Sequence, residues 1–330
     1  MNRRIAAIAN PHAASGRVGR LWPQLAGRLR QRLGDLTLRI TDSPGHATRI
    51  AQELITSGFD LIVAVGGDGT ISEVANGFLR DDWPISPQAQ LGILPVGTGA
   101  DFQRILAIPS DAERAIDILA NGKDFAIDVG KVKFVDADGC EAQRYFVNLA
   151  SFGVSGAIAA RAKNRLQALG GKAAFLWATL KTAATDHGRA VEIRLDDSAE
   201  WHRHYITNLA VGNGQFHGGG MRPCPRAILN DGLLDVTIIE YLNLFEIARD
   251  IRVLYSGDAY DHPKVHHRRA RRIAARSTEP TLIEVDGEPL GRLPLEIEVL
   301  PRRLRVLLPA SSPLWESRPG ADSGAPDSRG

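Results

Sequence analysis

Short apolar runs alternate with longer amphipathic segments over the first third of the chain. Runs rich in Ile, Val, Leu and Ala are typical of buried strands, and apolar residues at every third or fourth position are typical of helices. The predicted strands cover residues 4–9, 36–40, 61–65 and 90–94, and the predicted helices cover residues 18–33, 47–57, 71–78 and 112–120. Strands that alternate with helices form parallel sheets, so we predict an N-terminal, doubly wound α/β domain.

The pattern changes near residue 124 to short strands separated by turns. The predicted strands cover residues 125–134, 145–151, 190–195, 204–212, 234–239, 281–285 and 295–307, with helical regions at 157–185 and 244–255. The chain has 330 residues, which is more than one hydrophobic core usually supports. We therefore predict an α/β domain over residues 1–123, a mostly-β domain over 124–310 and a disordered tail over 311–330, which is rich in Ser, Pro, Gly and Asp.

The composition changes this picture little. A formal net charge of +2 favours no class of partner. Cys140 and Cys224 form neither a disulfide framework nor a metal-binding spacing, and a reducing cytoplasm is the default for such a chain. No stretch approaches the roughly 18 apolar residues that a membrane span needs. We expect a soluble, cytoplasmic protein whose contact with a bilayer is peripheral.

The turn Gly66-Gly67-Asp68-Gly69-Thr70 follows a predicted buried strand and precedes a predicted helix. Glycines let the backbone approach a ligand, and a helix N-terminus offers free N–H groups, so the turn suits phosphate. Its spacing is neither that of a Walker A loop nor that of a Rossmann fingerprint. A carboxylate at an anion site is repulsive unless a cation lies between them, so Asp68 implies Mg²⁺. The alternative is a tight turn in which Asp68 caps the following helix.

Two other predicted strands end in similar turns. Residues 10–16 (NPHAASG) follow the first strand, and residues 95–102 (PVGTGADF) follow the strand 90–94. The carboxyl ends of parallel strands meet at one edge of a sheet, where open α/β folds bind ligands. Three such turns together predict a nucleotide site at this edge.

These three turns resemble, in order and spacing, the nucleotide-binding blocks of the diacylglycerol kinase catalytic domain. Residues 41–47 (TDSPGHA), between the first turn and the glycine turn, resemble a further block of that domain. The resemblance to the bacterial YegS-like branch of this family extends to about residue 310. It implies a nucleotide-binding domain like those of NAD kinases and phosphofructokinases, then a β-sandwich domain, with the C-terminal segment packed back on the first domain. It also implies ATP and Mg²⁺ as cofactors.

The ATP contacts that the resemblance implies lie in four segments. They are Asn10, Pro11, His12, Ala13, Ala14, Thr41, Gly66, Gly67, Asp68, Gly69, Thr70, Ile71, Ser72 and Thr98. One position departs from the family pattern GTGNDF, because Ala100 replaces its Asn. The missing side chain could bond near the nucleotide or only within its loop.

Two sites in the second domain also depend on the resemblance. The segment Asn230-Asp231-Gly232 is by itself a common turn. In the family this loop holds a structural Mg²⁺. The resemblance therefore implies Asp231 as a ligand, together with the main-chain oxygens of Ile228 and Leu233. Asp286-Gly287-Glu288 is by itself typical of a solvated hairpin. The resemblance implies Glu288 as the general base, with Asp286 orienting it or raising its pKa.

Two stretches combine basic residues with other features of a membrane-binding surface. Residues 157–185 place Arg and Lys beside Leu, Phe and Trp177, and residues 264–276 contain no acidic residue. Anionic lipid head groups attract such runs, although nucleic acid would be attracted equally. The alternative for each stretch is a helix packed in the second domain with a solvated basic side.

The sequence therefore favours an ATP-dependent kinase that phosphorylates a lipid hydroxyl, such as that of diacylglycerol, at the inner face of the membrane. A homodimer is compatible with the sequence. The alternatives are an NAD kinase-like enzyme and a nucleotide-binding, membrane-associated protein with little catalysis, for which Ala100 is the only sign. Nucleic-acid binding is disfavoured because the basic run lacks interleaved aromatic residues.

Overall fold

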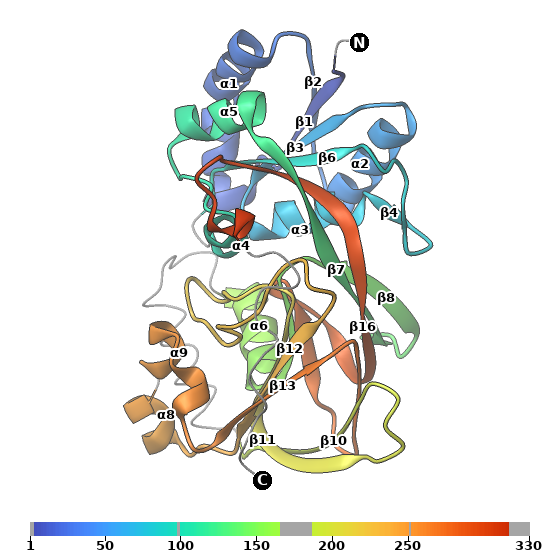
Figure 1. The fold of residues 1–330 in the computed structure, drawn as a ribbon, viewed down its shortest axis with the longest axis vertical. Helices are drawn as coiled ribbons and strands as arrows, with labels where there is room; N and C mark the ends of the chain where they lie inside the picture. The colour runs from blue at the N-terminus through green and yellow to red at the C-terminus, as the bar shows by residue number, and fades with distance from the viewer. Residues whose placement is uncertain (1–2, 98–99, 166–186, 251, 317–330) are drawn as a thin grey trace.

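The computed structural model describes residues 3–97, 100–165, 187–250 and 252–316. Figure 1 shows two lobes, of which the first holds the N-terminal helices and the second holds most of the later strands. Two long strands, β7 (Lys123–Asp136) and β16 (Glu288–Leu308), pair antiparallel and run through both lobes. The predicted fold class, an α/β domain followed by a β-sandwich domain, is confirmed.

The first lobe has a parallel sheet with the strand order β2–β1–β3–β6. Its strands are β1 (Ile5–Ala9), β2 (Leu36–Ile40), β3 (Leu61–Gly66) and β6 (Gln90–Pro95), and its helices are α1 (Ala13–Leu33), α2 (His46–Thr56), α3 (Asp68–Asn76), α4 (Asp101–Ile105) and α5 (Ala112–Asn121). Helix α1 packs against α5, and α2 packs against α3. A short hairpin, β4 (Leu79–Arg80) and β5 (Trp83–Pro84), extends from this lobe. The sequence analysis predicted neither this hairpin nor α4.

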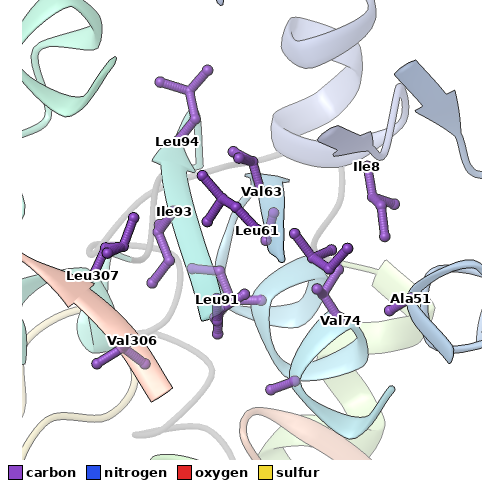
Figure 2. Close-up of a cluster of buried hydrophobic side chains, with 14 of the residues drawn as sticks. Ile8, Ala51, Leu61, Val63, Val74, Leu91, Ile93, Leu94, Val306 and Leu307 are labelled. Atoms are coloured by element: carbon purple, nitrogen blue, oxygen red, sulfur yellow. The ribbon is translucent and has the colours of Figure 1, made fainter. Parts of the chain in front are cut away.

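The core of the first lobe lies between the parallel strands and the helices that cover them. Strands covered on both faces need continuous apolar runs, and every residue of β1 and β3 is buried. Figure 2 shows Val306 and Leu307 of β16 beside Leu91 and Ile93 of β6. Val306 pairs in parallel with Leu91. The C-terminal strand therefore adds both a strand and core side chains to the N-terminal sheet.

The second lobe is built mainly of antiparallel strands. They are β8 (Glu141–Phe146), β9 (Leu149–Gly153), β10 (Arg189–Leu195), β11 (His202–Gly212), β12 (Leu234–Glu240), β13 (Val265–Ala270), β14 (Arg272–Ser277) and β15 (Leu282–Val285). The helices are α6 (Val154–Arg165), α8 (Leu244–Asp250) and α9 (Val253–Ser256), with a 3-10 turn at Ala259–Asp261. A second 3-10 turn, Pro313–Trp315, packs against the core of the first lobe. Phe146, Phe152, Val236 and Ile273 belong to its core.

Several predicted elements differ from the observed ones. The single strand predicted over 145–151 is two strands, β8 and β9, separated by a turn at Val147 and Asn148. The basic run 264–276 forms strands β13 and β14, not a helix. The helical region predicted over 157–185 begins at Val154 in α6, and its part beyond residue 165 lies outside the described residues.

The start of the predicted disordered tail is ordered. Trp315 packs edge-on against Phe125, with ring centroids 5.3 Å apart. Its indole N–H donates to the Pro309 carbonyl. These contacts bury part of a large aromatic ring, which explains why residues 311–316 fold despite their polar composition. The remainder of the tail lies outside the described residues.

Candidate active site

The predicted nucleotide turns meet at the carboxyl edge of the parallel sheet. The Asn10 N–H points to the Val65 carbonyl at 3.4 Å, and the Thr41 N–H donates to the Ala9 carbonyl at 3.0 Å. A Cβ added to Gly97 would lie 2.5 Å from the Gly67 Cα, so the turns after β3 and β6 touch. Pro11, His12 and Ala13 follow in the turn after β1, whereas Thr98 lies outside the described residues.

The turn after β1 continues into an unusual backbone. Ala14, Ser15 and Gly16 have φ values of 52°, 55° and 78°. Non-glycine residues seldom adopt this left-handed conformation, and such outliers cluster at functional sites. The His12 N–H donates to the Asn10 side chain, which helps to shape the turn. The strained run supports a ligand-binding role for this predicted ATP segment.

Asp68 caps a helix, but not the helix that it begins. Its Oδ2 accepts from the Asp101 N–H at 3.2 Å, and its Oδ1 accepts from the Phe102 N–H at 3.1 Å. These are the first N–H groups of α4, which otherwise lack helical partners. Asp68 itself lies in the first turn of α3. The carboxylate therefore fixes the turn after β6 relative to the turn after β3.

Asp101 is a second carboxylate of the site, and the sequence analysis did not single it out. It is 6% exposed, accepts from the Gly219 N–H at 2.8 Å and pairs with Arg104 at 3.0 Å. Burial raises the pKa of Asp101, and the nearby charge of Asp68 adds to the increase. The sequence signal that could have identified Asp101 was its place directly before Phe102 in the turn 95–102.

The predicted general base lies next to the glycine turn. A Cβ added to Gly69 would lie 3.6 Å from the Glu288 Oε1. The other carboxylate oxygen accepts from Arg144 Nη2 at 3.2 Å, and the Glu288 side chain is 37% exposed. Strand β16 thus brings Glu288 from the second lobe to the carboxyl edge of the parallel sheet in the first.

The Asp286 carboxylate is bonded to the turn between β8 and β9. Its carboxylate accepts from the backbone N–H groups of Val147, Asn148 and Leu149 at 3.2, 3.1 and 3.0 Å. It also accepts a hydrogen bond from the side chain of Ser72 in α3. Burial raises the pKa of Asp286, while these hydrogen bonds oppose the increase. Asp286 therefore ties the β8–β9 turn and the Glu288 turn to the first lobe.

A cavity of about 450 Å³ in the second lobe reaches this site. Its walls are mainly aliphatic and include Val147, Leu149, Val154, Ile158, Ala210, Met221, Ile239, Leu242, Ile247, Val253, Leu254 and Val265. Asp68, Asp101 and Phe102 of the first lobe line its polar end with Asp286 and Gly287 of the second. No Lys or Arg is among the described residues that line it.

A buried polar cluster also lines the cavity. Glu284 is 0% exposed, and its Oε2 accepts from the Gly287 N–H at 2.9 Å. His217 Nε2 lies 3.3 Å from Glu284 Oε1, which also accepts from the Ser151 hydroxyl. Neither His217 nor Glu284 belongs to a motif that could have drawn attention to the pair.

The predicted metal loop holds an ion pair. Asp231 accepts from the Leu233 N–H at 3.0 Å and pairs with Arg269. Asp128 lies nearby, fully buried, and accepts from the Gly232 N–H at 2.6 Å. Burial raises the pKa of Asp128 to about 6. Arg269 already neutralises Asp231, so a metal would have to displace it.

Acidic partners compensate most of the basic run 264–276. Lys264 pairs with Glu246, Arg269 with Asp231, Arg272 with Asp197 and Arg276 with Glu192. The histidines at positions 266 and 267 contact Glu240 and Asp235. The run is therefore less positive in the fold than in the sequence. No helix within the described ranges is long and apolar enough to cross a bilayer.

Comparisons with known proteins agree with this geometry. Residues 4–132 match the model of the diacylglycerol kinase catalytic domain, and residues 148–308 match that of the YegS C-terminal NAD kinase beta sandwich-like domain. A protein of Stenotrophomonas maltophilia named "Probable lipid kinase YegS-like" is 32% identical, with 84% of this chain and 88% of that protein covered. The chain belongs to the diacylglycerol kinase family.

Other members of the family match over almost the whole chain. A Staphylococcus saprophyticus protein named "Diacylglycerol kinase" is 29% identical over 94% of this chain and 96% of its own length. A crystal structure of a diacylglycerol kinase from Bacillus anthracis superimposes with a TM-score of 0.67 at 22% identity, covering 94% of this chain and 98% of that one. At that identity, the structural likeness concerns the fold alone. The predicted membership of a lipid kinase family is confirmed.

Proposed function

We propose that this protein transfers the γ-phosphoryl group of ATP to the hydroxyl of a membrane lipid such as diacylglycerol. The apolar cavity is the observation that carries the proposal. It lies in the second lobe, and its polar end is lined by Asp68 of the glycine turn. An aliphatic chain would bury apolar surface in such a cavity. Its hydroxyl would then face the phosphate-binding edge of the sheet.

The nucleotide would bind along the carboxyl edge, in the turns that follow β1, β2, β3 and β6. The glycine turn leads into the N-terminus of α3, where main-chain N–H groups suit phosphate, and the left-handed residues 14–16 follow the neighbouring turn at this edge. Ser72 and Thr70 are buried in α3, and Ile71 is 2% exposed. The Ile71 side chain thus belongs to the core, and its N–H donates to the Gly67 carbonyl at 3.0 Å, so Ile71 shapes the turn from within.

The residues present fit a divalent cation at this site. Asp68 and Asp101 both line the cavity, and burial together with the charge of Asp68 raises the pKa of Asp101. Each Asp68 oxygen accepts only one described amide hydrogen bond, which leaves lone pairs for a hard cation. Asp68, with Asp101 beside it, would hold Mg²⁺. When bound, the metal supplies positive charge to the phosphates and the transition state.

Glu288 would act on the acceptor. Its carboxylate lies beside Gly69 and is not buried, so it can accept the proton of the lipid hydroxyl. The hydroxyl oxygen then forms a bond to the γ-phosphorus as the bond from that phosphorus to the β,γ-bridging oxygen breaks. ADP leaves with the electron pair, and the proton remains on Glu288 until solvent removes it. Asp286 positions Glu288 through the turn that it stabilises.

The cavity disfavours an NAD kinase-like acceptor. NAD carries phosphates and hydroxyl groups, which need polar or basic partners. The described lining is mainly aliphatic and provides neither Lys nor Arg. The same feature favours a lipid with an uncharged head group over a phospholipid.

An assay with radiolabelled ATP against a lipid panel tests the proposal. Diacylglycerol, a sphingoid base, phosphatidylglycerol and NAD would each be incubated with the protein and Mg²⁺, and the products resolved by chromatography. We expect label in an organic-soluble lipid phosphate and none in NADP. Label in NADP alone would contradict the proposal. ATP binding without transfer to any acceptor would instead support a nucleotide-binding protein with little catalysis.

A further inference from the structure

The segment between β12 and the turn Ala259–Asp261 is apolar on two sides. Leu242, Ile247 and Leu254 line the cavity. On the other side, Leu244 is 42% exposed and Phe245 is 73% exposed. We call these two exposed residues the apolar tip. Figure 1 shows their helix, α8, with α9 on the outside of the second lobe.

This exposure is unusual for so apolar a segment. Neither α8 nor α9 contains a buried residue, although together they carry Leu, Phe, Ile, Val and Tyr side chains. A helix with one apolar stripe needs one apolar neighbour. A segment that shows apolar side chains to a cavity and also to the outside fits between two apolar phases. The cavity is one of them, and a bilayer would be the other.

The surroundings of the tip have the character of a membrane interface. Tyr205 is 52% exposed, and its ring centroid lies 5.3 Å from that of Tyr241, which precedes the tip. Tyrosine has an apolar ring and a polar hydroxyl, and it is enriched where hydrocarbon meets water. Two pairs of nearby charges neutralise each other, Lys264 with Glu246 and Arg249 with Asp250. These pairs weaken the electric field at the surface, which offers apolar contact.

We propose that Leu244 and Phe245 insert into the membrane interface and that the acceptor lipid enters the cavity past α8 and α9. The second half of this statement rests on the proposed lipid kinase function, whereas the first half does not. The tip differs from the basic run 264–276, whose attraction to a membrane would be electrostatic. Insertion of apolar side chains needs no anionic lipid and resists salt.

The test compares three proteins: the wild type, the double variant Leu244→Ser/Phe245→Ser, and the control Trp83→Ser. Trp83 is 62% exposed on the hairpin of the first lobe, where the Arg303 guanidinium lies over its ring. The control thus removes an exposed aromatic side chain far along the chain from the tip. Each protein is sedimented with phosphatidylcholine vesicles at low and high salt. Each is then assayed on long-chain diacylglycerol in those vesicles and on a dispersed short-chain diacylglycerol.

We expect the double variant to bind vesicles at least about tenfold more weakly than wild type, since it withholds two large apolar side chains. Its rate should fall on vesicles and stay unchanged on the dispersed lipid. The control should match wild type, and salt should have little effect. These results would support insertion at the tip.

Three outcomes would overturn the proposal. Unchanged vesicle binding by the double variant would show that the tip does not insert. A much lower melting temperature than that of the control would show that the chain itself covers the tip. A wild-type dimer that the double variant dissociates, measured by light scattering, would make the tip a subunit interface. If no lipid is phosphorylated by wild type, the proposed function fails while sedimentation still decides the tip.

Discussion

Ala100 occupies a conformation that suits asparagine better than alanine. Its φ and ψ are 60° and 25°, and it is the N-cap residue of α4. Asparagine tolerates this left-handed conformation better than most residues, and its side chain also caps helices. The first N–H groups of α4 are bonded to Asp68 instead. Asp68, from the turn after β3, thus caps α4 where Ala100 offers no side-chain cap.

Ala100→Asn should raise the free energy of unfolding by up to about 1 kcal/mol. The reason is relief of the left-handed strain, and denaturant unfolding measures it. Ala107→Asn is a matched control, because Ala107 also has a positive φ of 57° and follows α4. Both variants should stabilise the chain, and only the first should alter ATP binding. A loss of stability in Ala100→Asn would show that the loop has no room for the side chain.

Glu288→Gln tests the general base directly. The substitution keeps the size of the side chain and removes its ability to accept a proton, so kcat should fall by roughly 10²–10⁴-fold. ATP affinity should change little, since the carboxylate is proposed to face the acceptor. Kinetics with saturating lipid would measure the first and calorimetry the second. Glu296→Gln, an exposed position on the same strand, should behave as wild type; near-normal turnover of Glu288→Gln would exclude the role.

At the scale of elements, two glycine turns are packed against each other. The Val96 N–H donates to the Gly66 carbonyl at 3.0 Å, and Gly97 faces Gly67. A Cβ at Gly97 would lie 2.5 Å from the Gly67 Cα and 3.2 Å from its nitrogen. The backbone atoms cannot move aside as a side chain can. The distance between these two glycine turns thus depends on glycine at position 97.

Gly97→Ala should weaken ATP binding by at least about tenfold, because even a small displacement of the turn disturbs bound phosphates. Fluorescent-nucleotide titration would measure the change. Gly27→Ala is the matched control, since an added Cβ there meets no atom within 4 Å. The control should bind ATP normally and gain about 0.5–1 kcal/mol of stability, as expected for a helix interior. Normal ATP affinity in Gly97→Ala would place the nucleotide away from these turns.

The periodic elements of the first lobe could be predicted because their strands are buried on both faces. Helix α4 could not, since it has only five residues and its N-terminus is capped by Asp68 from another turn. Strands β13 and β14 were hidden because their basic side chains contact acidic groups, as Arg276 does with Glu192. The turn at Val147 is held by Asp286, far along the chain. Such distant contacts leave no local signal.

The candidate site also has residues that the sequence predicts and residues that it does not. The glycine turns, Asp68 and Glu288 lie in short motifs, which a family resemblance can carry over. The structure brings Glu288 beside Gly69, as a catalytic role requires, while Asp286 serves the fold around it. The cavity has no motif, since its lining is scattered from Asp68 to Gly287. Only the folded chain assembles it.

At the scale of the whole molecule, polar contacts connect the lobes around the site. Asn76 of α3 donates to the Tyr145 carbonyl at 2.8 Å and accepts from its N–H at 2.9 Å. Ser72 bonds to Asp286, and Asp101 accepts from Gly219. The long strands β7 and β16 provide the covalent connection. The glycine turns and the apolar cavity are therefore held in one arrangement, as the proposed transfer between two substrates requires.

The loop that contains Asp231 is bonded to the two long strands that connect the lobes. The Asp128 N–H on β7 donates to the Leu229 carbonyl at 2.6 Å, and Asp128 accepts from the N–H groups of Gly232 and Arg302. These bonds attach the loop to both long strands. The charge on Asp231 can be neutralised by Arg269 or by Mg²⁺, and the two alternatives give different dependences of stability on metal.

If Asp231 binds Mg²⁺, the metal should raise the melting temperature of the nucleotide-free protein, because a ligand of the native state stabilises it by RT ln(1 + [L]/Kd). Asp231→Asn should abolish this increase. Arg269→Gln should enlarge it, since the guanidinium that competes for Asp231 is removed. Asp197→Asn is the control, as Asp197 is an exposed partner of Arg272. Thermal melts across a series of Mg²⁺ concentrations decide between the alternatives. If the melting temperature depends on Mg²⁺ equally in wild type, Asp231→Asn and Arg269→Gln, Asp231 serves only the ion pair with Arg269.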